Sequence, residues 1–244
     1  MGSYFLFFPF ILLLAAIGYG QGAYASSRAT YYGSPDCKGT PTGACGYGEY
    51  GRTVNNGEVT GVSRLYRNGS GCGACYQVRC QIRTHCREEG VKVVVTDYGE
   101  GDRTDFILST QGYSKLARPN MAEELFAYGV VDVEYNRVPC RYGRRLMLKV
   151  HEYSNYPHYL ALVPLYNEGF SDITAMYIWQ DGMGWRPMRR AFGTVFDIPN
   201  PPKEPLLIRV QYNVQTEVKS ADITNAIPED WEVGVAYDTH VQIN

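Results

Sequence analysis

Cysteine is absent from the last part of this 244-residue sequence, because all seven cysteines lie at or before Cys140. The chain is long enough for one large all-β domain or for two domains of ordinary size once an N-terminal leader is set aside. The one-sided cysteine distribution favours two. We therefore predict a cysteine-rich domain over residues 26–140 and a cysteine-free domain over residues 146–244, joined by the basic stretch at 141–145.

Charge is absent from the first 25 residues, which contain an apolar run from Tyr4 to Ile17. This run is too short to span a bilayer comfortably, and Ala23 and Ala25 offer a small-residue cleavage site before Ser26. The missing Lys or Arg near the start departs from the usual signal peptide. We still predict a signal peptide over residues 1–25 and a secreted protein, with a retained membrane anchor as the alternative.

A surplus of positive charge is also missing, since the formal net charge is −2. Nucleic acids and anionic membranes are bound by basic faces, so neither is expected as a partner. No G-x-S-x-G motif occurs, and the four histidines are scattered, which argues against a serine nucleophile. The C-x-x-C pair at Cys72 and Cys75 lacks a second pair at zinc spacing. We expect no metal and no cofactor, and structural disulfides with one cysteine left over.

The pattern of apolar and turn residues predicts an all-β protein. Glycine recurs every few positions between residues 29 and 90, which favours short strands and tight turns over helices. Val91 begins a strand that is apolar on both faces and is therefore expected in the centre of a sheet. Ser109 is a candidate N-cap for one short helix. After residue 145, evenly spaced strands without helices are typical of a β-sandwich.

Four acids, Asp97, Glu100, Asp102 and Asp105, fall within nine positions directly after that central strand. Glycoside hydrolysis requires two carboxyl groups, and this cluster contains enough of them. Glu100 and Asp102 also lie in a Gly-rich stretch that turn formation alone would select, where they would simply be solvated. The sequence leaves both interpretations open.

Asn68 begins the only N-x-[ST] sequence in the chain, Asn68-Gly69-Ser70. It lies in a Gly-rich turn, where a glycan could remain in solvent. We predict a glycosylation site there, although Cys72 is close.

Several motifs together make the chain resemble the plant expansin superfamily, and most of all its expansin-like B branch. The resemblance covers essentially all of the chain after the leader. It rests on the segments ATYYGSPDC, GACGYG, GCGACYQVRC, VVVTDYGEGDRTDFILS, LSTQGYSKLA, GVVDVEYNRVPC and WRPMRRAFG. It implies a double-psi β-barrel similar to that of family 45 endoglucanases, followed by a carbohydrate-binding β-sandwich.

The resemblance also implies a disulfide pattern. The family pairing joins Cys45 to Cys72, Cys75 to Cys140, and Cys80 to Cys86. Cys37 lies outside the common set and is expected to be the unpaired thiol.

In the barrel, the resemblance implies a polysaccharide-binding groove with no complete catalytic pair. Thr30, Tyr31 and Tyr32 match groove residues of the first strand, and Asp97 matches an acid at the end of a central strand. Asp97 either contacts the substrate or merely orders a turn. The segment LSTQGYSKLA aligns without a gap, so that Ile107 occupies the position of the general acid in hydrolytic relatives. Asp105 lies two residues earlier, about 7 Å away on a regular strand, and is the remaining candidate donor.

In the sandwich, the family carries three Trp in the segment that reads GWRPMRRAFGTVF here. Trp185 is kept, whereas Phe192 and Phe196 replace the other two. Phenyl rings can still stack on sugar faces, so these three residues and Tyr166 are candidates for polysaccharide binding, with a place in the core as the alternative for each.

The resemblance implies a secreted, monomeric wall protein that binds cellulose and matrix glucans and perturbs contacts between them without hydrolysis. One alternative is an endo-β-glucanase that uses Asp97 and Asp105. The other is a wall-binding module without loosening activity, which shares every sequence feature with the first.

Overall fold

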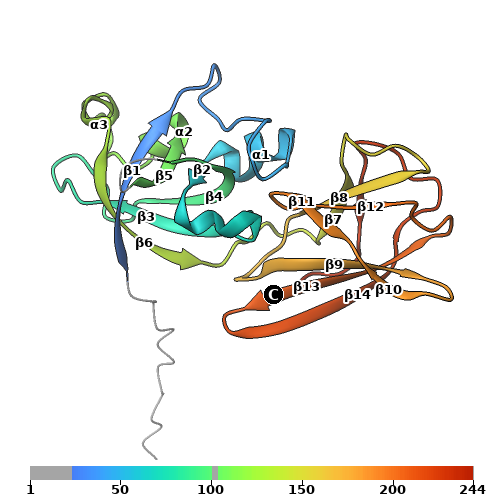
Figure 1. Cartoon of the computed structure of the whole chain (residues 1–244). Coiled ribbons are helices and arrows are strands. Elements are labelled where there is room, and N and C mark those ends of the chain that lie inside the picture. Colours follow the sequence, from blue (N-terminus) through green and yellow to red (C-terminus); the bar gives the residue numbers. More distant parts are fainter. Residues whose placement is uncertain (1–23, 101–103, 244) are drawn as a thin grey trace, which may run out of the picture.

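Strands form both halves of the computed structural model, which describes residues 24–100 and 104–243. A closed barrel lies beside a sandwich of two sheets (Figure 1), so the predicted all-β fold is confirmed. Residues 1–23 of the predicted leader and Asp102 lie outside the described residues. Within the two described ranges, no helix is long and apolar enough to cross a membrane.

The barrel consists of six strands in the order β1-β5-β2-β4-β3-β6. They are β1 (Ala25–Tyr32), β2 (Val59–Val62), β3 (Cys75–Cys80), β4 (Val91–Tyr98), β5 (Thr104–Ser109) and β6 (Val131–Val138). β1 runs parallel to β5 and β2 parallel to β4, while the other neighbours are antiparallel. Strand β4 lies between β2 and β3, so its predicted central place is confirmed. Both of its faces are buried: Val93 and Val95 fill the barrel core, and Val94 packs in a second apolar cluster on the other face.

Short helices connect the barrel strands. They are α1 (Glu49–Thr53), the 3-10 helices η1 (Val54–Gly57) and η2 (Arg64–Gly69), α2 (Thr110–Ser114) and α3 (Ala122–Tyr128). Ser109 caps α2 as predicted, since its hydroxyl accepts a hydrogen bond from the Gly112 amide at 3.0 Å. The expectation of strands and turns alone between residues 29 and 90 is wrong at α1, η1 and η2. Gly48 and Gly57, both at positive φ, lie at the start of α1 and at the end of η1, so the recurring glycines here bound helical turns as well as strands.

The sandwich consists of a four-stranded and a five-stranded sheet without helices, as predicted. The first has the order β10-β9-β13-β14 and the second β11-β12-β8-β7-β15. Their strands are β7 (Met147–Val150), β8 (Tyr159–Leu165), β9 (Asp172–Gln180), β10 (Gly184–Pro187), β11 (Arg189–Phe192), β12 (Val195–Pro199), β13 (Leu206–Val214), β14 (Glu217–Ile227) and β15 (Ala236–Asp238). Their inward side chains, such as Met176, Ile208 and Leu162, form one apolar cluster.

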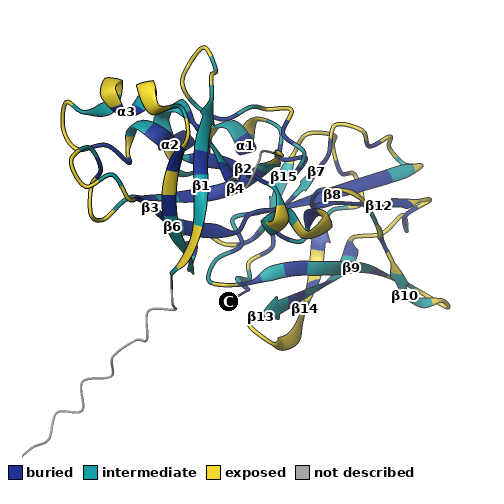
Figure 2. Ribbon diagram, turned by 60° about the vertical axis from the view of Figure 1, so that its left-hand side comes forward, coloured by how far each residue is buried: buried dark blue, intermediate teal, exposed yellow. Residues whose placement is uncertain are grey.

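The barrel and the sandwich share a core. Ala161, Val163 and Leu165 on β8 belong to the same buried cluster as the barrel interior. Strand β8 is therefore buried on both faces (Figure 2), by the opposite sheet on one side and by the barrel on the other. The backbones also approach closely, since a Cβ built on Gly69 would lie 2.0 Å from the carbonyl oxygen of Gly193.

Candidate functional site

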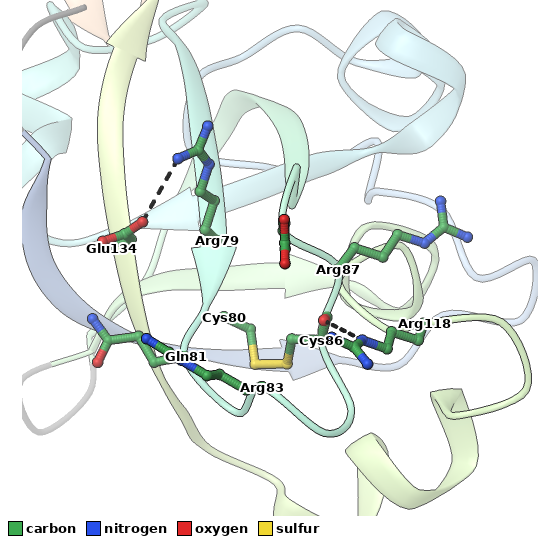
Figure 3. Close-up of a pocket in the computed structure, with 9 residues that line it drawn as sticks. Arg79, Cys80, Gln81, Arg83, Cys86, Arg87, Arg118 and Glu134 are labelled. Atoms are coloured by element: carbon green, nitrogen blue, oxygen red, sulfur yellow. Dashed lines mark hydrogen bonds and ion pairs between the residues drawn. A yellow bond between two sulfur atoms is a disulfide. The ribbon is translucent and has the colours of Figure 1, made fainter.

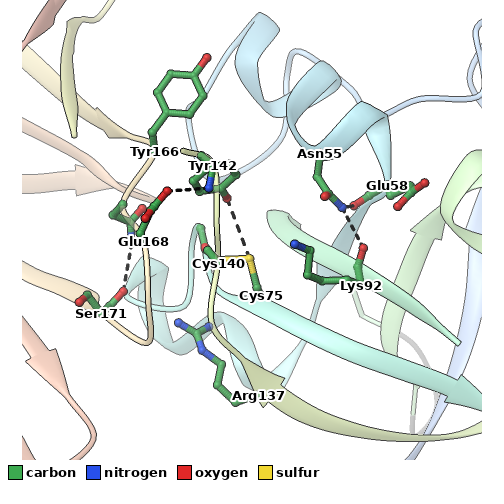
Figure 4. Close-up of a disulfide and its surroundings, with 12 residues drawn as sticks. Asn55, Glu58, Cys75, Lys92, Arg137, Cys140, Tyr142, Tyr166, Glu168 and Ser171 are labelled. Carbon is green, nitrogen blue, oxygen red and sulfur yellow. Dashed lines mark hydrogen bonds between the residues drawn. A yellow bond between two sulfur atoms is a disulfide. The ribbon is translucent and has the colours of Figure 1, made fainter. Parts of the chain in front are cut away.

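Three disulfides fix the cysteine-rich half. The structure pairs Cys45 with Cys72, Cys75 with Cys140, and Cys80 with Cys86, as the family resemblance implies. Cys37 is an exposed free thiol. The Cys75–Cys140 bond lies at the junction with the sandwich (Figure 4), where Cys140 and Gly169 exchange backbone hydrogen bonds of 2.9 and 3.0 Å. This disulfide therefore anchors the connection between the two halves.

One row of residues crosses four neighbouring barrel strands. Thr30 on β1 pairs with Ile107 on β5, Ile107 pairs with Gly61 on β2, and Gly61 pairs with Asp97 on β4. The alternate residues of these strands, such as Phe106, fill the barrel interior, so this row faces outward. Because Gly61 has no side chain, an open position separates Ile107 from Asp97, and a Cβ built on Gly61 would lie 3.6 Å from that of Asp97.

Asp97 orders the turn that lies over the end of β4. Its Oδ1 accepts hydrogen bonds from the Ala44 amide at 2.6 Å and from the Tyr98 amide at 2.8 Å. Its Oδ2 has no partner among the described residues. The carboxylate therefore orders this turn through Oδ1.

Of the three candidates on β1, Tyr32 has the surroundings of a binding residue. Its hydroxyl is buried without a hydrogen-bond partner among the described residues. Burial and the nearby Asp97 charge raise the pKa of Tyr32 to about 12. The ring also lines a hollow of about 420 Å³ formed with the loop at 33–41. Tyr32 therefore presents a neutral hydroxyl beside Asp97.

Thr30 and Tyr31 make structural contacts instead. The Thr30 hydroxyl donates to the Gly129 carbonyl at 2.9 Å. The Tyr31 ring packs against Tyr113 at 4.7 Å and Phe126 at 4.8 Å between ring centroids. Both residues hold β1 against the segment around α3.

Asp105 is a buried structural ion. It is 2% exposed, and its carboxylate accepts hydrogen bonds from Ser27, Ser63 and Arg64, the last through two nitrogens at 3.1 and 2.7 Å. Burial acts to raise the pKa of Asp105, but these hydrogen bonds and the Arg64 charge outweigh it and lower the pKa. A general acid must hold its proton near the working pH. The prediction that Asp105 could replace the missing acid is therefore wrong, because its register break against β1 and its partners commit it to an ion pair.

Exposed aromatic rings continue from Asp97 towards the sandwich. Tyr98 is 42% exposed, and its ring lies 5.1 Å from that of Tyr66, whose hydroxyl donates to the Ala44 carbonyl. On the sandwich side, Phe192 is 38% exposed and packs against Gly46, where a built Cβ would lie 2.9 Å from the ring.

Beyond Phe192 the aromatic surface extends to Tyr153, which is 71% exposed and lies 6.3 Å away between ring centroids. We name Tyr32, Asp97, Tyr98, Tyr66, Phe192 and Tyr153 the groove residues. Tyr66, Tyr98 and Tyr153 were not predicted, because no motif distinguishes them among the 21 tyrosines of the chain.

Trp185 lies on the opposite outer face of the sandwich. It pairs with Trp179 across β10 and β9, the two rings lie 5.4 Å apart, and the Arg209 guanidinium covers the Trp185 ring at 4.1 Å. The neighbouring inward residue Ile178 is in the sandwich core, so Trp185 faces away from the barrel. The structure therefore does not bring Trp185 and Phe192 together.

Phe196 and Tyr166 occupy interior positions. Phe196 is 1% exposed in the sandwich core, with the Arg190 guanidinium 4.4 Å from its ring centroid. The prediction that Phe196 stacks on a polysaccharide is wrong, because the β11–β12 hairpin turns it inward while Val195 faces the barrel. Tyr166 lies at the junction (Figure 4), 4.9 Å from Tyr50 between ring centroids, and helps to join the two halves.

Two further predicted positions, Asn68 and Glu100, are exposed to solvent. Asn68 is exposed on η2, where an attached glycan would project into solvent, so its modification stays a prediction. Glu100 is exposed and contacts the Tyr98 hydroxyl, as expected of a solvated turn. Over residues 24–100 and 104–243, no group of three His, Cys, Asp or Glu residues is arranged to hold a metal ion.

Comparison with known proteins identifies the family. A family model described as the expansin C-terminal domain matches residues 146–228, and one described as lytic transglycolase matches residues 58–135. Expansin-like B1 of Arabidopsis thaliana is 54% identical over 239 residues, which cover 97% of this chain and 95% of that protein. Expansin-like B1 of Oryza sativa subsp. japonica is 38% identical, with 96% and 93% covered.

The fold is also that of solved expansins. Crystal structures of a Clavibacter michiganensis expansin, without ligand and as a mutant in complex with cellohexaose, superpose with TM-scores of 0.65 and 0.66 at 20% identity. Each comparison covers 90% of this chain and 98% of the bacterial one. With relatives of this similarity along almost its whole length, the chain belongs to the plant expansin superfamily and is similar to its expansin-like B members.

Proposed function

We propose that this chain is a secreted protein of the plant cell wall that binds a β-glucan along the groove residues and loosens contacts between wall polymers without hydrolysis. The bacterial expansin of the same fold was crystallised with cellohexaose, a β-glucan fragment. The exposed rings of Tyr98, Phe192 and Tyr153 suit the flat apolar faces of sugars. Cellulose and the neutral matrix glucans have such faces.

The buried Tyr32 hydroxyl carries this proposal. A buried polar group without a partner costs about 1–3 kcal/mol, and such groups are rare in folded proteins. We propose that a bound sugar opens the hollow at Tyr32, so that a sugar hydroxyl pairs with the tyrosine hydroxyl near the Asp97 carboxylate.

Hydrolysis is not part of the proposal, because the outward row, as far as the chain is described, offers no carboxylic acid besides Asp97. The outward row places Ile107 two strands from Asp97, and an isoleucine side chain cannot transfer a proton. Asp105 is held ionised by Arg64. A missing general acid removes a factor of about 10²–10⁴ in rate, and Asp97 alone cannot supply both roles.

Glucan binding should respond to the groove and not to the opposite face. We expect Tyr32→Phe and Phe192→Ala each to weaken binding to cellulose and soluble β-glucan about five- to tenfold, through loss of one hydrogen bond or one stacked ring. Tyr32→Phe should leave thermal stability equal or slightly higher, since the hydroxyl has no partner in the free protein.

Trp185→Ala is the matched control, because it removes a larger ring from the opposite face. Affinity gels and depletion assays should show unchanged binding for this variant. If Trp185→Ala weakens binding and Phe192→Ala does not, the glucan binds the four-stranded sheet that carries Trp185, and the proposed groove is contradicted.

Loosening should occur without bond cleavage. We expect the purified protein to increase the creep of heat-inactivated plant walls held under constant load, with no release of reducing sugar from the same walls. An unchanged creep rate with intact glucan binding would reduce the protein to a binding module. Sugar release that survives Asp97→Asn would point to a contaminating enzyme, whereas release abolished by it would contradict a non-hydrolytic groove.

A further inference from the structure

An arginine-lined hollow opens beside the Cys80–Cys86 disulfide at the end of β3 (Figure 3). Its volume is about 600 Å³, within the range of ligand sites. Its lining residues are Arg79, Cys80, Gln81, Arg83, Cys86, Arg87, Glu88, Arg118 and Glu134. Strand β4 runs antiparallel to β3, so the hollow lies beside Val91, six residues or roughly 20 Å from Asp97 along the strand.

Two of the four arginines of this hollow, Arg87 and Arg118, are held in place by the surrounding backbone. Arg87 Nε donates to the Ala117 carbonyl at 2.7 Å, and Arg118 Nε donates to the Cys86 carbonyl at 3.0 Å. The Cys80–Cys86 disulfide closes the loop that carries these contacts. The guanidinium groups of Arg87 and Arg118 are therefore each oriented through Nε, while their terminal nitrogens have no partner among the described residues.

The lining of the hollow has a net positive charge, whereas the whole chain has a net negative one. Four arginines face two acids, Glu88 and Glu134, of which Glu134 lies 3.8 Å from Arg79. The lining thus has an excess of two positive charges in a chain of formal net charge −2. Arg83 is exposed and makes no ion pair or hydrogen bond within residues 24–100 and 104–243.

We propose that the arginine hollow binds an acidic polysaccharide whose uronate carboxylates pair with Arg83, Arg87 and Arg118. A guanidinium fork matches a carboxylate with two parallel hydrogen bonds, and the pre-oriented forks of Arg87 and Arg118 lose little entropy on binding. Arg83 adds a third, exposed guanidinium beside them. The lining has no aromatic ring on which a neutral sugar could stack, which separates its chemistry from that of the groove.

The test compares charged and esterified forms of one polymer. Protein purified from the medium of a secreting host is measured against polygalacturonate, against its methyl ester, and against a neutral β-glucan. We expect affinity for polygalacturonate that weakens steeply between about 0.1 M and 1 M salt, and little affinity for the ester. Arg83→Gln/Arg87→Gln should weaken polygalacturonate binding about tenfold or more, with β-glucan binding unchanged.

The matched control is Arg141→Gln/Lys203→Gln, which removes the same charge from exposed positions outside the hollow. Retained affinity in this control supports the site, and an equal loss would show a general charge effect and overturn it. Dextran sulfate that binds as tightly as polygalacturonate would overturn the assignment to carboxylates. Because β-glucan binding is followed in parallel, a failure of the groove proposal is seen separately.

Discussion

Replacement of Asp105 by alanine is expected to cost about 2–4 kcal/mol of unfolding free energy, because the carboxylate is buried and accepts from three side chains, although the Arg64 side chain is itself exposed. The variant removes the shared acceptor of Ser27, Ser63 and Arg64 and leaves two partly buried hydroxyls without it. Denaturant titration would measure the loss. Asp105→Asn should lose less, since the amide oxygen still accepts from one of these donors.

Asp222→Ala is the control for this prediction. Asp222 also receives two hydrogen bonds from one arginine, Arg209, but on the exposed face of the sandwich. Exposed ion pairs contribute about 0–1 kcal/mol, so its loss should be small. Equal losses in the two variants would show that burial of Asp105 contributes nothing.

The same residue predicts a pH dependence. The folded-state pKa of Asp105 lies below its ordinary value, so its contribution is complete above the unfolded pKa of about 4 and is lost as the pH falls through the folded value. The difference in unfolding free energy between wild type and Asp105→Asn should therefore shrink as the pH falls below about 4, because only the wild-type side chain is protonated. A constant difference between the two proteins from pH 7 to pH 2 would contradict the ion pair.

Replacement of Gly69 by alanine is expected to separate the sandwich from the barrel. Gly69 has a φ of +90°, and its built Cβ would lie 2.0 Å from the Gly193 carbonyl oxygen. The strained backbone costs about 1–2 kcal/mol, and the clash between two backbones adds about 1–3 kcal/mol. Calorimetry should show the loss, and binding of long glucans that reach Phe192 should weaken more than binding of short oligosaccharides.

Gly234→Ala separates the two causes. Gly234 has a similar φ of +81°, but nothing lies within 4 Å of a Cβ built on it. This variant should show only the smaller, conformational loss and bind long glucans normally. If Gly69→Ala behaves like Gly234→Ala, the close contact at Gly193 does not hold the two halves together.

The N-cap of α2 could be predicted because its signal is local: Ser109 lies directly before the helix that it caps. The position of Ile107 follows from the family alignment instead, and its replacement of the general acid stays a prediction. The polar role of Asp105 could not be predicted, because its partners Arg64 and Ser27 are 41 and 78 residues away in the sequence. Nothing in the stretch around Asp105 distinguishes a buried ion from a catalytic acid.

The prediction that Trp185, Phe192 and Phe196 act together in polysaccharide binding fails for a geometric reason. Trp185 and Phe192 lie seven residues apart, but Trp185 belongs to β10 of one sheet and Phe192 to β11 of the other. The chain crosses between the sheets at Met188, which is buried in the core. A short segment that changes sheets places neighbouring rings on opposite faces, and the motif contains no sign of the crossing.

The shared core of β8 has a mechanical consequence. Two modules joined by a linker would swivel and absorb a pull applied to one of them. Here Val163 and Leu165 lock the sandwich to the barrel interior, and the Cys75–Cys140 bond secures the one connecting segment. If a polymer is bound at Tyr153 as proposed, a force on that polymer is therefore transmitted through the shared core to a second segment bound at Tyr32.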